Sequence, residues 1–186
     1  MMQFAHKIRN ARYGFLAVVS AILMLNLLTD RLDLSDNTTP VIEQIMKSTW
    51  GIVFVTILGP VIEELIFRLA ILGSLLRWTR INPWISIVIS ASLFTLAHWN
   101  PAQTPVALAM GIMLGIFYWR SGFWLCLSIH IFNNAIAVLE YKVSPNFSLT
   151  DSIGGPVVAW AIIILCAFVV LGSMHRYINE TNQTII

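Results

Sequence analysis

The chain has 186 residues, of which 58% are hydrophobic and 11% are charged, and its formal net charge is +2. A soluble domain carries about 25% charged residues, so this composition excludes an ordinary soluble protein. The basic residues are scattered along the chain and give no indication of nucleic-acid binding. With a mean hydropathy of +0.79, the sequence predicts an all-α, polytopic bundle of transmembrane helices in a lipid bilayer, and residues 1–186 are expected to form a single integral membrane domain.

About six apolar segments are predicted to cross the membrane. They are residues 13–28, 50–72, 84–99, 104–119, 123–139 and 156–174. The first is short for a span, but no small-x-small cleavage motif follows it, so we interpret it as a retained helix and not as a signal peptide. An acidic loop, residues 30–40, and a short amphipathic helix, residues 41–47, are expected before the second span.

The second span contains Gly59-Pro60, where we expect a break, because proline removes a backbone hydrogen bond and suits the first turn of a helix. Such a break would bring the following residues closer to the end of the third span, which stops at Asn100-Pro101.

The fourth span carries Gly111 and Gly115, a small-xxx-small face that predicts close helix packing. A tight turn at residues 120–122 leads into the fifth span. A polar loop, residues 140–155, and a polar tail, residues 175–186, are expected on either side of the sixth.

The distribution of lysine and arginine predicts the orientation of the chain, because cytoplasmic loops are enriched in these residues. With six spans, seven basic residues fall on the side of the two termini and three on the other side. The seven are Lys7, Arg9, Arg12, Arg77, Arg80, Arg120 and Arg176, and the three are Arg31, Lys47 and Lys142. We therefore expect a multi-pass protein of the cell membrane with both termini in the cytoplasm.

Glu63, Glu64 and Arg68 are the only charged residues between positions 50 and 76. An ionised side chain inside a membrane costs about 3 kcal/mol or more, so these groups must be paired or used. On a helix, Glu64 and Arg68 lie one turn apart on one face and can pair. Glu63 points about 100° away, which leaves it as the free carboxylate. The alternative is a purely structural network of all three.

Three further polar side chains lie within or at the edge of other predicted spans: His98, His130 and Asn134. His130 and Asn134 are four residues apart and share one helix face. A single histidine in a helical bundle is more often a packing residue than a catalytic one. However, polar groups in a membrane face the interior of the bundle, so these three are expected to converge with Glu63.

This set of groups suits the hydrolysis of an amide bond. A carboxylate can act as general base, and an imidazole can orient the attacked water or protonate the leaving amine. A second imidazole and an amide N–H can stabilise an oxyanion. Two other chemistries compete: a zinc site of two histidines and a glutamate, for which no HExxH spacing is present, and a thiol–imidazole pair formed by Cys126 and His130.

Three motifs, in this order, resemble those of the CAAX-protease and bacteriocin-processing family of intramembrane glutamic endopeptidases, which are related to the eukaryotic CAAX prenyl endopeptidase. The motifs are Glu63-Glu64-x-x-x-Arg68, Phe94-x-x-x-His98 and His130-x-x-x-Asn134. The resemblance covers about residues 59–140. It implies a compact prokaryotic member, located in the inner membrane, with a peptidase core at about residues 50–140.

The resemblance also implies a role for each residue. Glu63 and His98 would activate water without a metal or other cofactor, His130 and Asn134 would form the oxyanion hole, and Glu64 and Arg68 would support the site. The expected substrate is a membrane-anchored or hydrophobic peptide or protein precursor, cut near the outer side of the membrane. The alternatives are a non-catalytic membrane binding or immunity protein and a zinc-dependent membrane peptidase.

Overall fold

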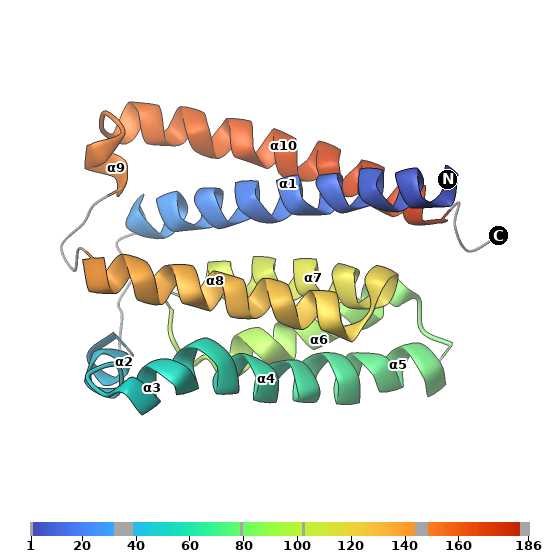
Figure 1. The fold of residues 1–186 in the computed structure, drawn as a ribbon, viewed down its shortest axis with the longest axis horizontal. Coiled ribbons are helices and arrows are strands. Elements are labelled where there is room, and N and C mark those ends of the chain that lie inside the picture. Colours follow the sequence, from blue (N-terminus) through green and yellow to red (C-terminus); the bar gives the residue numbers. More distant parts are fainter. Residues whose placement is uncertain (1, 32–38, 79, 102, 144–148, 183–186) are drawn as a thin grey trace. The chain divides into compact units, whose positions relative to one another are not determined.

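The computed structural model describes residues 2–31, 39–78, 80–101, 103–143 and 149–182 (Figure 1). Within these ranges every regular element is a helix and none is a strand, which confirms the all-α class. The contacts divide the chain into two compact units: residues Met1–Leu32 with Ser148–Ile186, and residues Asp33–Phe147. The single integral membrane domain expected from the sequence stays a prediction.

The first unit contains α1 (Met2–Arg31), the short α9 (Leu149–Ser152) and α10 (Pro156–Asn182). In Figure 1, α1 and α10 lie side by side and run in opposite directions. The polar tail expected from residue 175 is instead helical to Asn182. Met174 and Tyr177, three residues apart, are both buried, so the packed face of α10 continues past its apolar part.

The second unit begins with α2 (Thr39–Ile45), followed by a helical run from Thr49 to Trp78 and three further helices. The run consists of α3 (Thr49–Val53), η1 (Phe54–Leu58), α4 (Gly59–Glu64), η2 (Leu65–Leu72) and α5 (Gly73–Trp78), and the helices that follow are α6 (Pro83–Ala97), α7 (Thr104–Ser121) and α8 (Phe123–Val143). The loop expected from residue 140 thus begins later than predicted, because α8 continues to Val143.

The helical run does not break at Gly59-Pro60, so that expectation is wrong. Leu58, Gly59 and Leu65 all have right-handed helical dihedrals. The Gly59 N–H donates to the Phe54 carbonyl, five residues back, which makes the turn before Pro60 a wider π-helical turn. Pro60 then lies in the first turn of α4, where a proline is tolerated. Glu63 therefore lies near the middle of a continuous run and is not brought closer to one end.

Helices α6 and α7 pack closely through glycine, as the small-xxx-small pattern predicts. A Cβ atom added to Gly111 would lie 3.0 Å from the Ala91 Cβ, and one added to Gly115 would lie 2.9 Å from the Ile87 Cγ2. The turn after α7 is closed by Gly122, whose φ of 88° favours glycine. These contacts hold α7 against α6, and Gly122 turns the chain from α7 into α8.

Five of the six predicted spans fall within helices of the structure, and the third, residues 84–99, extends two residues past the end of α6 at Ala97. By length and composition, one described helical stretch, Pro156–Asn179, is long and apolar enough to cross a membrane. Three shorter stretches are also apolar: Tyr13–Leu28, Pro83–Ala97 and Phe123–Leu139. The number of membrane crossings therefore stays a prediction.

Candidate active site

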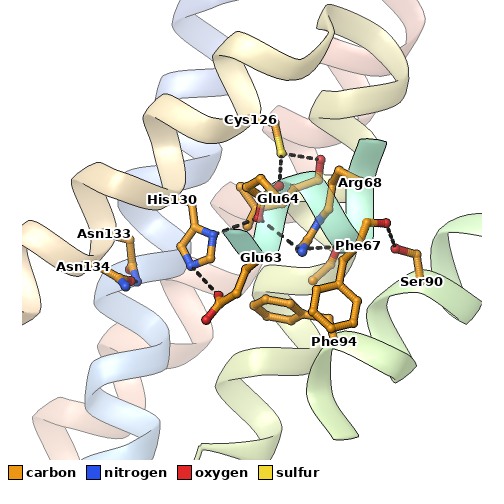
Figure 2. A network of polar contacts seen from close by, with 12 residues as sticks. Glu63, Glu64, Phe67, Arg68, Ser90, Phe94, Cys126, His130, Asn133 and Asn134 are labelled. Carbon is orange, nitrogen blue, oxygen red and sulfur yellow. Dashed lines mark hydrogen bonds and ion pairs between the residues drawn. The ribbon is translucent and has the colours of Figure 1, made fainter. Parts of the chain in front are cut away.

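Glu64 lies at the centre of a buried polar cluster in the second unit (Figure 2). Its side chain is completely buried at the end of α4. The Oε1 atom contacts Arg68 Nη1 at 3.2 Å and His130 Nδ1 at 2.8 Å, and the Cys126 thiol donates to Oε2 at 2.8 Å. Glu64 is thus bound by Arg68 from the same helical run and by His130 and Cys126 from α8.

Arg68 is the buried counter-ion of Glu64, which confirms the pairing predicted from their spacing. Its side chain is completely buried within η2. The Nη2 atom donates to the Gly111 carbonyl at 3.5 Å, and the guanidinium lies over the Phe94 ring at 4.3 Å. A guanidinium over an aromatic face is favourable where water is excluded. Removing either member of the ion pair would leave an uncompensated buried charge.

His130 lies between the two adjacent glutamates. Its Nδ1 faces Glu64 Oε1 at 2.8 Å, and its Nε2 faces Glu63 Oε2 at 3.5 Å. A neutral imidazole has one donor and one acceptor nitrogen, so both contacts with ionised carboxylates are attractive only when the ring is doubly protonated. With His130 in that form, two carboxylates, one guanidinium and one imidazolium give a cluster without net charge.

Glu63 differs from Glu64 in its surroundings. A third of its side chain is exposed, whereas that of Glu64 is completely buried. Its one ion-pair contact among the described residues is the 3.5 Å approach to His130. Glu63 is therefore the carboxylate with a free side, as expected from its position on the helix.

His98 is the C-cap residue that follows α6, and the Phe94 ring lies between it and the cluster. Its Nδ1–H donates to the Phe94 carbonyl at 2.8 Å, which leaves Nε2 as the acceptor nitrogen of the neutral ring. The Phe94 ring centroid is 4.6 Å from that of His98 and 5.8 Å from that of His130. Within the described part of the chain, no hydrogen bond or ion pair joins His98 to Glu63.

Asn134 lies one turn beyond His130 on α8 and is turned toward η1. Its Nδ2 donates to the Val55 carbonyl at 3.0 Å, and its Oδ1 accepts a bond from Asn133 Nδ2 at 3.4 Å. One amide N–H of Asn134 thus remains for another acceptor. The structure places Asn134 on the same helix as His130, with a different partner.

Three members of the cluster were not assigned a role from the sequence. The spacing of Cys126 relates it to His130, but its thiol faces Glu64 and the Leu114 carbonyl, the latter at 3.3 Å. Phe94 supplies the ring between the two histidines. Ser90 donates to the Phe67 carbonyl within η2 at 2.7 Å. The spacing of Cys126 four residues before His130 was the one signal available for its position.

In the part of the chain that the structure describes, no group of three or more His, Cys, Asp or Glu side chains is arranged to hold a metal ion. The alternative zinc site of two histidines and a glutamate therefore has no support from this geometry. Metal-independence itself stays a prediction.

Comparison with known proteins supports the resemblance seen in the motifs. The family model "Type II CAAX prenyl endopeptidase Rce1-like" matches residues 45–136. "Membrane-embedded CAAX protease MroQ" of Staphylococcus aureus is 31% identical over 117 residues, which cover 60% of this chain and 47% of that protein. "Putative membrane peptidase YdiL" of Bacillus subtilis is 29% identical over 106 residues, which cover 56% and 43%.

The chain spans about half the length of the curated relatives it matches, and no solved structure matches it. The six residues singled out from the sequence all fall within the matched range. They are Glu63, Glu64, Arg68, His98, His130 and Asn134. This chain is thus a membrane protein, and its residues 45–136 belong to the Rce1-like family of type II CAAX prenyl endopeptidases.

Proposed function

We propose that this chain is a membrane peptidase of the glutamic type, which hydrolyses a peptide bond in a membrane-anchored or hydrophobic peptide or protein precursor. The observation that carries the proposal is the contrast between two adjacent carboxylates. Glu64 is buried and bound on both oxygens, while Glu63 keeps a third of its side chain exposed beside His130. A carboxylate with one open side is placed to take a proton from water.

In the proposed reaction, Glu63 removes a proton from a water molecule, and the water oxygen attacks the carbonyl carbon of the scissile bond. His98 orients this water through Nε2, because its Nδ1–H is used by the Phe94 carbonyl. As the C–N bond breaks, the proton on Glu63 passes to the leaving nitrogen. Atoms and charge are balanced without a metal or other cofactor.

His130 and Asn134 are proposed to stabilise the negative oxygen of the tetrahedral intermediate. The His130 Nε2 contact with Glu63 is 3.5 Å long, longer than a good hydrogen bond, so a substrate carbonyl can replace it. Asn134 keeps one amide N–H besides the one donated to Val55. Both roles follow from the family resemblance, and the remaining donors are compatible with them.

A hydrophobic substrate is supported by the apolar surface on either side of Glu63. Ile62, Leu65 and Ile66 are all exposed along α4 and η2. A peptide with an apolar segment can pack on this surface and present its neighbouring bond to Glu63. The relatives' names, a CAAX protease and a membrane peptidase, point to the same class of substrate.

Replacing Glu63 with glutamine tests the proposal, because the amide keeps the shape of the side chain but does not act as the base. The purified chain in lipid vesicles would be incubated, in the presence of a chelator, with a library of membrane-anchored peptides. New peptide termini would be counted by mass spectrometry. We expect Glu63→Gln to lower the cleavage rate by about 10²- to 10⁴-fold.

Glu43→Gln is the matched control, because it removes a carboxylate from α2, outside the cluster, and should cleave at the unmodified rate. Cleavage by Glu63→Gln at that same rate would contradict the proposal. Peptide binding without new termini in the unmodified chain would instead indicate a binding or immunity protein, and loss of activity in the chelator would indicate a metal peptidase.

A further inference from the structure

Cys126 is a completely buried residue of α8, one helical turn before His130. Its Sγ lies 2.8 Å from Glu64 Oε2 and 3.3 Å from the Leu114 carbonyl oxygen. Figure 2 shows the thiol on the opposite side of the Glu64 carboxylate from His130. Both neighbours of the sulfur are oxygen acceptors, so the cysteine must supply the hydrogen as a neutral thiol.

The thiol completes the set of donors around the Glu64 carboxylate. Arg68 and His130 both contact Oε1, and Cys126 is the group that donates to Oε2. Without the thiol, Oε2 would be a buried, charged oxygen lacking this donor, which is costly. The carboxylate would then rotate to share Arg68 or His130 between its two oxygens.

Rotation of Glu64 would be transmitted to the proposed reaction through His130. The 2.8 Å bond from Nδ1 to Glu64 fixes one side of the imidazole, and the opposite nitrogen faces Glu63. A displaced Glu64 oxygen would therefore tilt the imidazole ring. The tilt would move Nε2 away from Glu63 and from the position proposed for the substrate oxygen.

We propose that the Cys126 thiol is a positioning residue, which holds the Glu64 carboxylate in the orientation that aims His130 at the reacting groups. This role rests on the proposed peptidase function. It also separates Cys126 from the nucleophile of a thiol–imidazole pair: both nitrogens of His130 face carboxylates, so this imidazole is not directed at the sulfur.

The hydrogen bond itself can be observed by infrared spectroscopy of the S–H stretch, independently of any peptidase activity. The chain has two cysteines, so Cys166→Ala leaves the Cys126 thiol as the sole source of the band, and Cys126→Ala leaves that of Cys166. We expect the Cys126 band at lower frequency than the Cys166 band, because a hydrogen bond to a carboxylate weakens the S–H bond. Equal frequencies would overturn the proposal.

The effect on His130 can be measured by ¹⁵N NMR of histidine-labelled protein in lipid. Cys126→Ala should shift the His130 ring-nitrogen resonances, and Cys126→Ser, which keeps a donor, should largely restore them. Cys166→Ala, the matched control in α10, should leave them unchanged. Ring resonances that are the same in Cys126→Ala and the unmodified chain would show that the thiol does not position His130.

In the peptide-cleavage assay, Cys126→Ala should lower kcat by about tenfold with little change in KM, since a thiol is a weak donor. Cys126→Ser should recover most of the loss. A serine variant as slow as the alanine variant would contradict positioning by a donor. If Glu63→Gln proved fully active, the peptidase proposal would fail, while the infrared and NMR results would still decide whether Cys126 positions Glu64 and His130.

Discussion

Glu63 and Glu64 are identical side chains in two different environments, and the proposed difference in their roles depends on those environments. They are neighbours in the sequence, but one is partly exposed and the other is completely buried against Arg68. A single imidazole reaches both, because the two ring nitrogens of His130 point in opposite directions. The difference in pairing was predictable from helix geometry, since four residues separate Glu64 from Arg68 and the helix turns about 100° per residue.

Glu64→Gln should destabilise the fold by about 3–5 kcal/mol, because it leaves the buried Arg68 guanidinium without its counter-charge. Thermal unfolding of the purified protein in detergent would measure the loss. Glu63→Gln is the matched control, since its side chain is partly exposed and no arginine among the described residues pairs with it. If the two variants unfold at the same temperature, Glu64 does not have the supporting role assigned to it.

The helical run from Thr49 to Trp78 is the element that carries the site, and two of its five segments are π-helical. Such segments are rare and frequently lie at functional sites. η1 supplies the Val55 carbonyl to Asn134, and η2 supplies Arg68 and the Phe67 carbonyl that binds Ser90. The wider turns thus lie on both sides of the two glutamates.

Close packing of α6 on α7 can be tested with a pair of glycine variants. Gly115→Ala would place a methyl group 2.9 Å from Ile87 Cγ2, and we expect a loss of about 1–3 kcal/mol in unfolding free energy. Gly172→Ala in α10 is the control, because nothing lies within 4 Å of the added methyl group. It should be neutral or stabilise by up to about 1 kcal/mol. Equal effects in thermal unfolding would show that the close approach is unimportant.

The sequence predicted the helices and the glycine contacts, but not the π-helical register. The eight residues of η2 are apolar except for Arg68, so their pattern contains no period that separates a wider turn from an ordinary one. The partner of Cys126 was also unpredictable. Spacing along α8 relates Cys126 to His130, whereas its contact with Glu64 depends on how α8 packs on α4. The sequence also placed the ends of α8 and α10 too early. The polar residues before Val143 and Asn182 suggested a loop and a tail, but they belong to helices that are packed on one face.

At the scale of the molecule, the proposed site belongs to one compact unit. Residues Asp33–Phe147 contain the matched range 45–136 and every candidate residue. The peptidase core expected at residues 50–140 lies within this unit. The other unit contains the long apolar helix Pro156–Asn179 and Cys166.

The orientation of the chain can be tested at the two ends of α7. Gln103 precedes this helix and Arg120 lies in its last turn, about 26 Å apart at 1.5 Å per residue. On a background with serine at Cys126 and Cys166, Gln103→Cys should react with an impermeant thiol reagent added to whole cells, and Arg120→Cys should not. Ser148→Cys should also react. The reverse pattern would place the termini outside and the proposed cut on the cytoplasmic side.

The ion pairs of the cluster also have a consequence for the insertion of this chain into a membrane during translation. Glu64 is made 66 residues before His130. If the run from Thr49 to Trp78 crosses the membrane as predicted, Arg68 is its cation until α8 follows, and with both glutamates ionised it has one uncompensated negative charge, which is costly. A doubly protonated His130 on α8 would neutralise this charge. This prediction implies that stable insertion of the early helical run depends on a helix translated later, and that the residues proposed for catalysis also complete membrane integration.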